Sequence, residues 1–230
     1  LFSGQLMSNF ESDGGSEGPW DDRGELAWTE FDWERYLRGQ DEAVLRYLRH
    51  YEAARGKDDR IDAVAEKMGW DGEDWTEDES REGAAETAAG TADDDVYTLH
   101  KNPVYIATKA IYASLEHSWM ALAADPARVA PSSALQLVQT FHRGAGQAME
   151  AVHAVDLGDY AMAVSLFKRA LDSLNDSLAT LAAPESSPHP LVEAWREEAR
   201  ARLFDLREIW LRVVTECRDE LARPDDEDEE

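Results

Sequence analysis

Apolar residues recur along residues 159–182 at spacings that alternate between four and three positions without interruption. The series comprises Tyr160, Val164, Phe167, Leu171, Leu174, Leu178 and Leu181. This heptad spacing places the side chains on one face of an α-helix. A second series with the same spacing follows in 190–221: Ala199, Leu203, Leu206, Trp210, Val213 and Cys217. Two such faces on consecutive helices predict antiparallel neighbours in a helix bundle.

Start and stop signals divide the chain into further helices, whereas alternating β-branched runs are nearly absent. We expect helices over 30–54, 59–68, 103–124, 132–156, 159–182 and 190–221, which makes the fold class all-α. Thr29 and Asp32 have the spacing of a capping box, and Ser132 or Ser133 is expected to cap the 132–156 helix. Gly69 and Gly158 follow their helices, where a left-handed residue belongs.

The predicted 103–124 helix carries two apolar stripes. Its core stripe is Val104, Ala107, Ile111, Leu115 and Leu122, and a second stripe of Tyr105, Tyr112 and Trp119 lies about 90° around the helix. An apolar arc this wide indicates two neighbours rather than one. We expect the aromatic-rich N-terminal helices of 26–70 to pack against the second stripe. The alternative is an exposed groove for a partner helix.

Acidic charge is concentrated in three segments. The formal net charge is -26, of which residues 1–25 carry -5, residues 71–95 carry -10 and residues 224–230 carry -6. Such segments bury too little apolar surface to fold alone, so we expect disordered acidic segments at these positions. The predicted organisation is therefore N-terminal helices in 26–70, an acidic linker over 71–95, a bundle core of four long helices over 96–223 and an acidic tail.

Composition also limits the function classes. A chain this acidic is not expected to bind nucleic acid, because phosphate contacts require Lys and Arg. No run of apolar residues is long enough to span a membrane, and the single cysteine fits a reducing cytoplasm. Adaptation to high salt and mimicry of DNA are less suitable explanations of the acidity, since most of the excess lies in the three acidic segments.

The motifs with catalytic or metal-binding potential are weak. Glu150-Ala-Val-His153 has the E-x-x-H spacing of di-iron bundles, and Glu116-His117 and His142 lie on the same pair of predicted helices. Helical periodicity turns these side chains away from the core, so we expect no metal and no other cofactor. The G-x-G within 142–147 follows no strand, which leaves a kink or a close helix contact. Cys217 lies on an apolar series and is expected to be a buried, unreactive thiol.

Two tryptophans lie close together at the start of the acidic linker. Trp70 and Trp75 occur in Gly-Trp-Asp-Gly-Glu-Asp-Trp-Thr-Glu-Asp. Acidic segments with isolated bulky residues are typical of disordered interaction motifs. The alternative is that Trp70 closes the preceding helix and Trp75 packs back on the core. The candidate interaction surface therefore comprises Tyr105, Tyr112, Trp119, Trp70 and Trp75.

The segment from Gly158 to Leu171, Gly-Asp-Tyr-Ala-Met-Ala-Val-Ser-Leu-Phe-Lys-Arg-Ala-Leu, resembles the second helix of a tetratricopeptide repeat. Ala163, Phe167 and Ala170 match the small, aromatic and small positions of that family. The resemblance covers 14 of the 230 residues, and no 34-residue period extends it. What it implies is a helical hairpin and not membership of the family.

These features predict a non-enzymatic cytoplasmic protein that acts in protein–protein interaction or as a scaffold. Its partner is expected to be another protein or a second copy of the chain, and not nucleic acid or a membrane. The alternative is a helical-bundle enzyme or small-molecule binder, whose pocket between the helices would be lined by the Tyr105, Tyr112 and Trp119 stripe.

Overall fold

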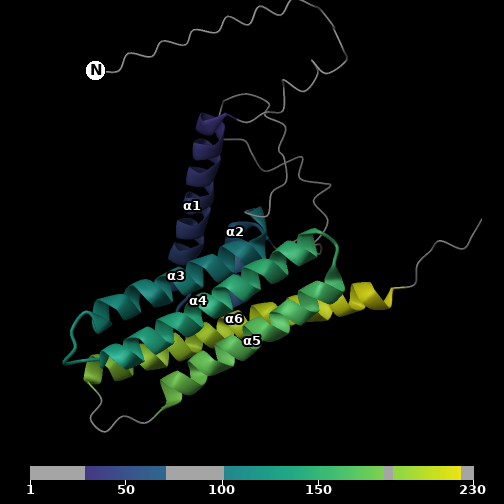
Figure 1. The fold of residues 1–230 in the computed structure, drawn as a ribbon. Coiled ribbons are helices and arrows are strands. Elements are labelled where there is room, and N and C mark those ends of the chain that lie inside the picture. The colour runs from purple at the N-terminus through teal and green to yellow at the C-terminus, as the bar shows by residue number, and fades with distance from the viewer. Residues whose placement is uncertain (1–28, 71–100, 184–188, 224–230) are drawn as a thin grey trace, which may run out of the picture. The chain divides into compact units, whose positions relative to one another are not determined.

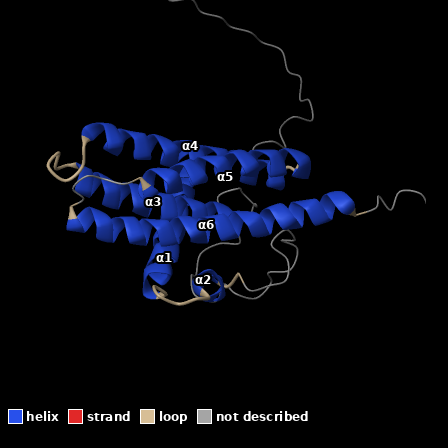
Figure 2. Ribbon diagram, turned by 90° about the horizontal axis from the view of Figure 1, so that it is seen from below, coloured by secondary structure: helices blue, strands red, loops and turns tan. Residues whose placement is uncertain are grey.

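The computed structural model describes residues 29–70, 101–183 and 189–223, and all regular structure within these ranges is helical (Figure 2). The elements are α1 (Glu30–Ala53), α2 (Arg60–Met68), α3 (Pro103–Ala123), α4 (Pro131–Asp156), α5 (Tyr160–Ala182) and α6 (Pro190–Ala222). The prediction of an all-α chain is thus confirmed over these ranges. The acidic segments 1–25, 71–95 and 224–230 lie outside them.

The chain divides into two compact units, Leu1–Arg38 and Gly39–Glu230. The described part of the first unit is the start of α1. There Thr29 and Asp32 form the predicted capping box: the Thr29 backbone N–H donates to Asp32 Oδ2 at 2.9 Å, and the Asp32 N–H donates to Thr29 Oγ1 at 3.3 Å.

In the second unit, α3, α4, α5 and α6 lie side by side (Figure 1), with α4 between α3 and α5 and with α6 touching both α3 and α5. Contacting pairs give the directions of the helices. Tyr112 meets Phe141, and further along α3 the Trp119 indole donates to Ala134, earlier on α4. Likewise Ser173 and Ser177 on α5 bond to Gln147 and Thr140 on α4. Both pairs of helices are therefore antiparallel.

Local chemistry explains where these helices begin and end. Asn102 caps α3 by accepting hydrogen bonds from the Val104 and Tyr105 N–H groups, and Pro103 occupies the first turn, where no N–H is needed. Gly158 has a φ of 74°, which allows the chain to leave α4 in a left-handed conformation. One residue later, Asp159 caps α5 through the Met162 N–H. This tight turn joins α4 and α5 in the helical hairpin expected from the sequence.

The start of α4 differs from the prediction. Ala130, and not Ser132 or Ser133, occupies the N-cap position, and Pro131 is the first helical residue. Proline has a φ suited to the first turn and lacks an N–H that a cap would have to satisfy, so the helix starts without a side-chain cap. Moreover, α4 runs unbroken through Gly144 and Gly146, so the glycine pair does not interrupt it.

The core is centred on Trp210 of α6. Its ring lies 6.1 Å from the ring of Tyr112 on α3 and 6.4 Å from that of Phe167 on α5, and its indole N–H donates to Thr108 Oγ1 at 3.1 Å. The apolar series of α6 predicted from the sequence is buried throughout. Burying a large apolar side chain contributes about 1.5–3 kcal/mol, so these rings supply a large part of the interior's stability.

Candidate functional site

Two residues of the predicted interaction surface, Tyr112 and Trp119, are buried, with only 4% and 3% of their surfaces exposed. The Tyr112 ring packs against Phe141 of α4 and Trp210 of α6. The Trp119 ring lies 4.6 Å from that of Trp195 on α6. At these two positions the aromatic stripe of α3 therefore faces α4 and α6. The expectation that the N-terminal helices cover the stripe is wrong for Tyr112 and Trp119.

The other residues of the predicted surface have separate environments. Tyr105 is half-buried, and its hydroxyl accepts a hydrogen bond of 3.2 Å from Gln40. Trp70 follows Gly69, whose φ is 75°, and stacks on the Tyr47 ring at 5.7 Å. It thus closes the end of α2, as one of the two interpretations expected. Trp75 lies outside the described residues. The four described members of the set do not share one exposed face.

The histidine and glutamate side chains that resembled metal ligands lie at the surface. Glu150, His142 and His153 are exposed, and His142 Nε2 lies 2.8 Å from Glu116 Oε1 on α3. Within the ranges that the structure covers, no group of three His, Cys, Asp or Glu side chains is arranged to hold a metal ion. His142 and Glu116 thus form an exposed cross-helix pair.

Cys217 is buried on the core side of α6. Burial, together with the negative charges of Glu216 and Glu220, raises the pKa of its thiol to about 11. A thiol with this pKa is protonated at neutral pH and is therefore a poor nucleophile.

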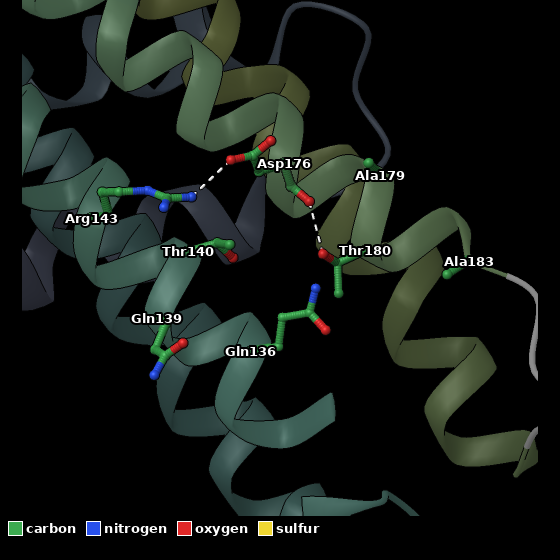
Figure 3. Close-up of a pocket in the computed structure, with 8 residues that line it drawn as sticks. All are labelled: Gln136, Gln139, Thr140, Arg143, Asp176, Ala179, Thr180 and Ala183. Atoms are coloured by element: carbon green, nitrogen blue, oxygen red, sulfur yellow. Dashed lines mark hydrogen bonds and ion pairs between the residues drawn. The ribbon is translucent and has the colours of Figure 1, made fainter. Parts of the chain in front are cut away.

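The structure contains an open groove between α4 and α5 that sequence reasoning did not predict (Figure 3). Its volume is about 540 Å³, and its lining residues are Gln136, Gln139, Thr140, Arg143, Asp176, Ala179, Thr180 and Ala183. Nearer to the turn at Gly158, buried small residues allow the two helices to approach closely: Gly144, Ala148, Ala151, Ala163 and Ala170. The groove lies toward the opposite end of the hairpin, where α4 begins and α5 ends.

A line of hydrogen bonds runs from the α4–α5 interface into the groove. Ser173 Oγ donates to Gln147 Oε1 at 2.7 Å and accepts from Arg143 Nε at 3.1 Å. Arg143 Nη2 then reaches Asp176 Oδ2 at 2.7 Å across the groove (Figure 3). Both partners of this ion pair are exposed, so the pair contributes only about 0–1 kcal/mol to stability. It is weak enough to be exchanged for contacts with a ligand.

The floor of the groove is fixed, whereas its rim is free to bind. Thr140 is buried, and its hydroxyl donates to the Leu137 carbonyl and accepts from Ser177. By contrast, Gln136 and Gln139 are exposed, and their amides make no hydrogen bond to another residue in the described part of the chain. In Figure 3 the Gln136 side chain points toward α5. The rim therefore offers amide donors and acceptors above a rigid base.

A buried ionic cluster, which we call the Tyr51 cluster, joins α1, α2 and α6. It comprises Tyr51, Arg60 and Asp205: the Tyr51 hydroxyl donates to Asp205 Oδ2 at 2.5 Å, and Arg60 Nη1 lies 3.4 Å from the same oxygen. Arg60 also donates from Nε to the Tyr51 carbonyl at 3.0 Å, and its guanidinium lies 3.4 Å from the centre of the Tyr51 ring. The Arg60 side chain is only 7% exposed.

Arg202 extends this cluster to α3. Its guanidinium contacts Glu52 at 2.8 Å, Glu198 at 3.0 Å and the Ser114 hydroxyl at 2.6 Å. Burial raises the pKa of Asp205, although the Tyr51 hydrogen bond and the charges of Arg60 and Arg202 oppose the shift. Burial and the neighbouring Asp205 also raise the pKa of the Tyr51 hydroxyl, so it stays protonated. Apart from Arg60 Nη2, which is buried without a hydrogen-bond partner among the described residues, the cluster pairs its polar groups internally and acts as a structural clamp.

The chain matches no known family model, no curated protein and no solved structure. In addition, none of the described helices is both long and apolar enough to cross a membrane.

Proposed function

We propose that the chain is a non-enzymatic cytoplasmic scaffold that binds another protein through the groove between α4 and α5. In this proposal the four long helices α3–α6 form an antiparallel bundle that holds the groove rigid. The N-terminal helices brace the bundle through the Tyr51 cluster.

The observation that carries this proposal is the chemistry of the groove. Pockets for small molecules usually enclose most of the surface of their ligand. This groove is open, and its rim consists of amide, hydroxyl, charged and alanine side chains. Such a rim suits the backbone amides and polar side chains of a polypeptide segment, which are matched by the side-chain amides of Gln136 and Gln139.

The alternative function, an enzyme or small-molecule binder with an aromatic pocket, has less support. Its pocket would be lined by Tyr105, Tyr112 and Trp119. Two of these rings are occupied by contacts with the rings of Phe141, Trp210 and Trp195. A ligand would have to displace these neighbours, which would expose apolar surface in the core.

Site-specific photo-crosslinking tests the proposal. Benzophenone is placed at Gln139, on the groove rim, and in a matched control at Arg49, which is exposed on α1. In native lysate we expect one discrete, stoichiometric adduct from position 139 and none from position 49. Thr180→Arg, which fills the groove, should abolish the adduct. Equal adducts from both positions, or an adduct that Thr180→Arg leaves unchanged, would contradict the proposal.

A further inference from the structure

Four large apolar side chains on α6 are exposed, and two of them, Phe204 and Leu211, lie in its middle stretch. Phe204 is 48% exposed and Leu211 is 38% exposed. They are seven residues apart, and in a helix that rises 1.5 Å per residue this places them about 10 Å apart along one side. The two side chains thus form a pair of apolar anchor points on a single face.

This face of α6 points away from α1 and α3. At about 100° per residue, Phe204 and Leu211 are about 160–180° around the helix from Arg202, which contacts Glu52 of α1 and Ser114 of α3. Helix α6 also contacts α2, through Arg212 and Asp62, and α5. The Phe167 and Trp210 rings lie 6.4 Å apart, so Lys168 is at the level of the same stretch of α6. We call Phe204, Arg207, Leu211 and Lys168 the α5–α6 flank.

The basic side chains of the α5–α6 flank have no acidic partners within the described residues. Arg207, between the two apolar anchors, and Lys168 are both exposed, and neither forms an ion pair there. The acids nearby on α6 are already engaged, since Glu208 bonds to Arg212 at 3.1 Å and Glu197 to Arg200 at 2.7 Å. Two uncommitted positive charges therefore border the apolar pair, in a chain whose net charge is -26.

We propose that the α5–α6 flank binds an acidic peptide segment of a partner protein, with two bulky apolar residues about 10 Å apart seated on Phe204 and Leu211. Carboxylates of that segment pair with Arg207 and Lys168. Charge complementarity selects this occupant, because an acidic segment gains from both bases and a basic or neutral one does not. The inference rests on the proposed scaffold function only in that the chain binds another protein, because the α5–α6 flank is a surface separate from the α4–α5 groove.

Fluorescence anisotropy with a synthetic probe tests this inference on the full chain. The probe is fluorescein-labelled Glu-Asp-Glu-Trp-Glu-Asp-Leu-Glu-Asp-Glu, in which the apolar residues are three positions apart. In a polyproline II conformation, which has three residues per turn, they lie on the same side about 9 Å apart. We expect saturable binding that weakens as salt is raised from about 50 to 200 mM. A peptide with Gln and Asn in place of its acids should bind at least about tenfold more weakly.

Point substitutions then locate the binding site of the probe on the chain. Arg207→Glu and Phe204→Ala should each weaken binding about tenfold or more. The matched control Arg49→Glu makes the same charge change on α1 and should alter affinity less than about twofold. All three positions are exposed, and melting curves check that each variant stays folded. No binding by the wild-type chain, or an affinity that Arg207→Glu leaves unchanged, would overturn the inference.

The crosslinking and anisotropy experiments test the groove proposal and the flank inference independently. If the Gln139 adduct forms but probe binding does not depend on Arg207, the flank inference is wrong and the scaffold function stands. If probe binding depends on Arg207 and Phe204 but no groove adduct forms, the groove proposal is wrong and the flank remains a binding site.

Discussion

Gly144→Ala is the substitution whose effect the structure specifies most closely. A Cβ atom at this position of α4 would lie 2.6 Å from the Tyr112 hydroxyl oxygen, 3.4 Å from Tyr112 Cζ and 3.6 Å from Ser173 Cβ. Only the first distance is too short for a non-bonded contact. The tyrosine cannot simply move away, because its ring is buried between Phe141 and Trp210. The hydroxyl group and the missing methyl group of Gly144 therefore occupy the same space.

Two effects of opposite sign determine the stability of Gly144→Ala. Replacing glycine by alanine inside a helix stabilises it by about 0.8–1 kcal/mol. Overpacking a core by one methyl group costs about 1–3 kcal/mol. The variant should therefore range from neutral to about 2 kcal/mol less stable than the wild-type chain. Tyr112→Phe should be neutral or slightly stabilising, because the buried hydroxyl has no hydrogen-bond partner within the described residues.

The double variant separates the two effects. Tyr112→Phe removes the oxygen that lies at 2.6 Å and leaves Cζ at an acceptable distance, so Gly144→Ala should then stabilise the chain by about 1 kcal/mol. Urea denaturation of all four chains, followed by circular dichroism, gives the coupling free energy, which we expect to be about 1–3 kcal/mol. A coupling below about 0.5 kcal/mol would refute the proposed contact between Gly144 and Tyr112.

The remaining predictions concern the core, a cap and the Tyr51 cluster. Phe167 and Leu174 are fully buried, so replacing each by alanine should lower the free energy of unfolding, measured by urea denaturation, by about 3–5 and 2–5 kcal/mol respectively. Leu178 is half-buried, so Leu178→Ala should cost less, and equal costs would contradict the orientation of α5. Asp159→Ala should cost about 1 kcal/mol through loss of the α5 N-cap, and Asp159→Asn should retain most of that stability. Asp205→Ala should destabilise the chain by on the order of 3 kcal/mol, because it leaves the buried Arg60 guanidinium and the Tyr51 hydroxyl without their acceptor. Burial raises the pKa of Asp205, so the stability supplied by its bound proton is complete below about pH 4 and is lost as the pH rises through the raised pKa. The cost of Asp205→Ala should therefore be larger near pH 4 than at pH 7, and denaturation across this range would show the opposite trend if the pKa were lowered.

Helix positions were predictable from the sequence because each is marked by local chemistry. The observed bounds of α1 to α6 lie within one residue of the expected ones. Gly69 and Gly158 adopt positive φ angles, and Asp159 caps α5, as their positions indicated. These features depend on residues close together in the chain, so a sequence read along its length contains the necessary information.

The orientation of helix faces was harder to predict. On α4, the helical spacing of Leu135, Val138 and Phe141 indicates a core face, yet Leu135 is 58% exposed and Leu137 is 1% exposed. On α5, Leu171 is only half-buried, and the small residues Ala170 and Ser177 are buried instead. Small residues contribute little to an apolar pattern, yet they determine which side of α5 approaches α4 most closely. The apolar pattern therefore identified the helices but assigned their buried faces wrongly by part of a helical turn.

The Tyr51 cluster left no recognisable signal in the sequence. Its members are separated by nine residues between Tyr51 and Arg60 and by 145 between Arg60 and Asp205. Arginine and aspartate on a helix usually indicate a solvated face, and only the docking of α1 and α2 against α6 buries these two. The α4–α5 groove was missed for a related reason, since it arises from the separation of two helices and not from a motif.

Helix α5 connects the two proposed binding surfaces. Asp176 and Thr180 line the groove, and Lys168 of the α5–α6 flank lies about 80–120° from them around α5. Lys168 and Asp176 are eight residues apart, or about 12 Å along the helix, a distance that one partner protein can span. Linked binding at both surfaces raises affinity above that of either alone. Arg207→Glu and Thr180→Arg should then each reduce the yield of the Gln139 adduct with the whole partner, whereas only Arg207→Glu should weaken binding of the short acidic peptide. An adduct yield that is insensitive to Arg207→Glu would mean that the two surfaces serve different partners.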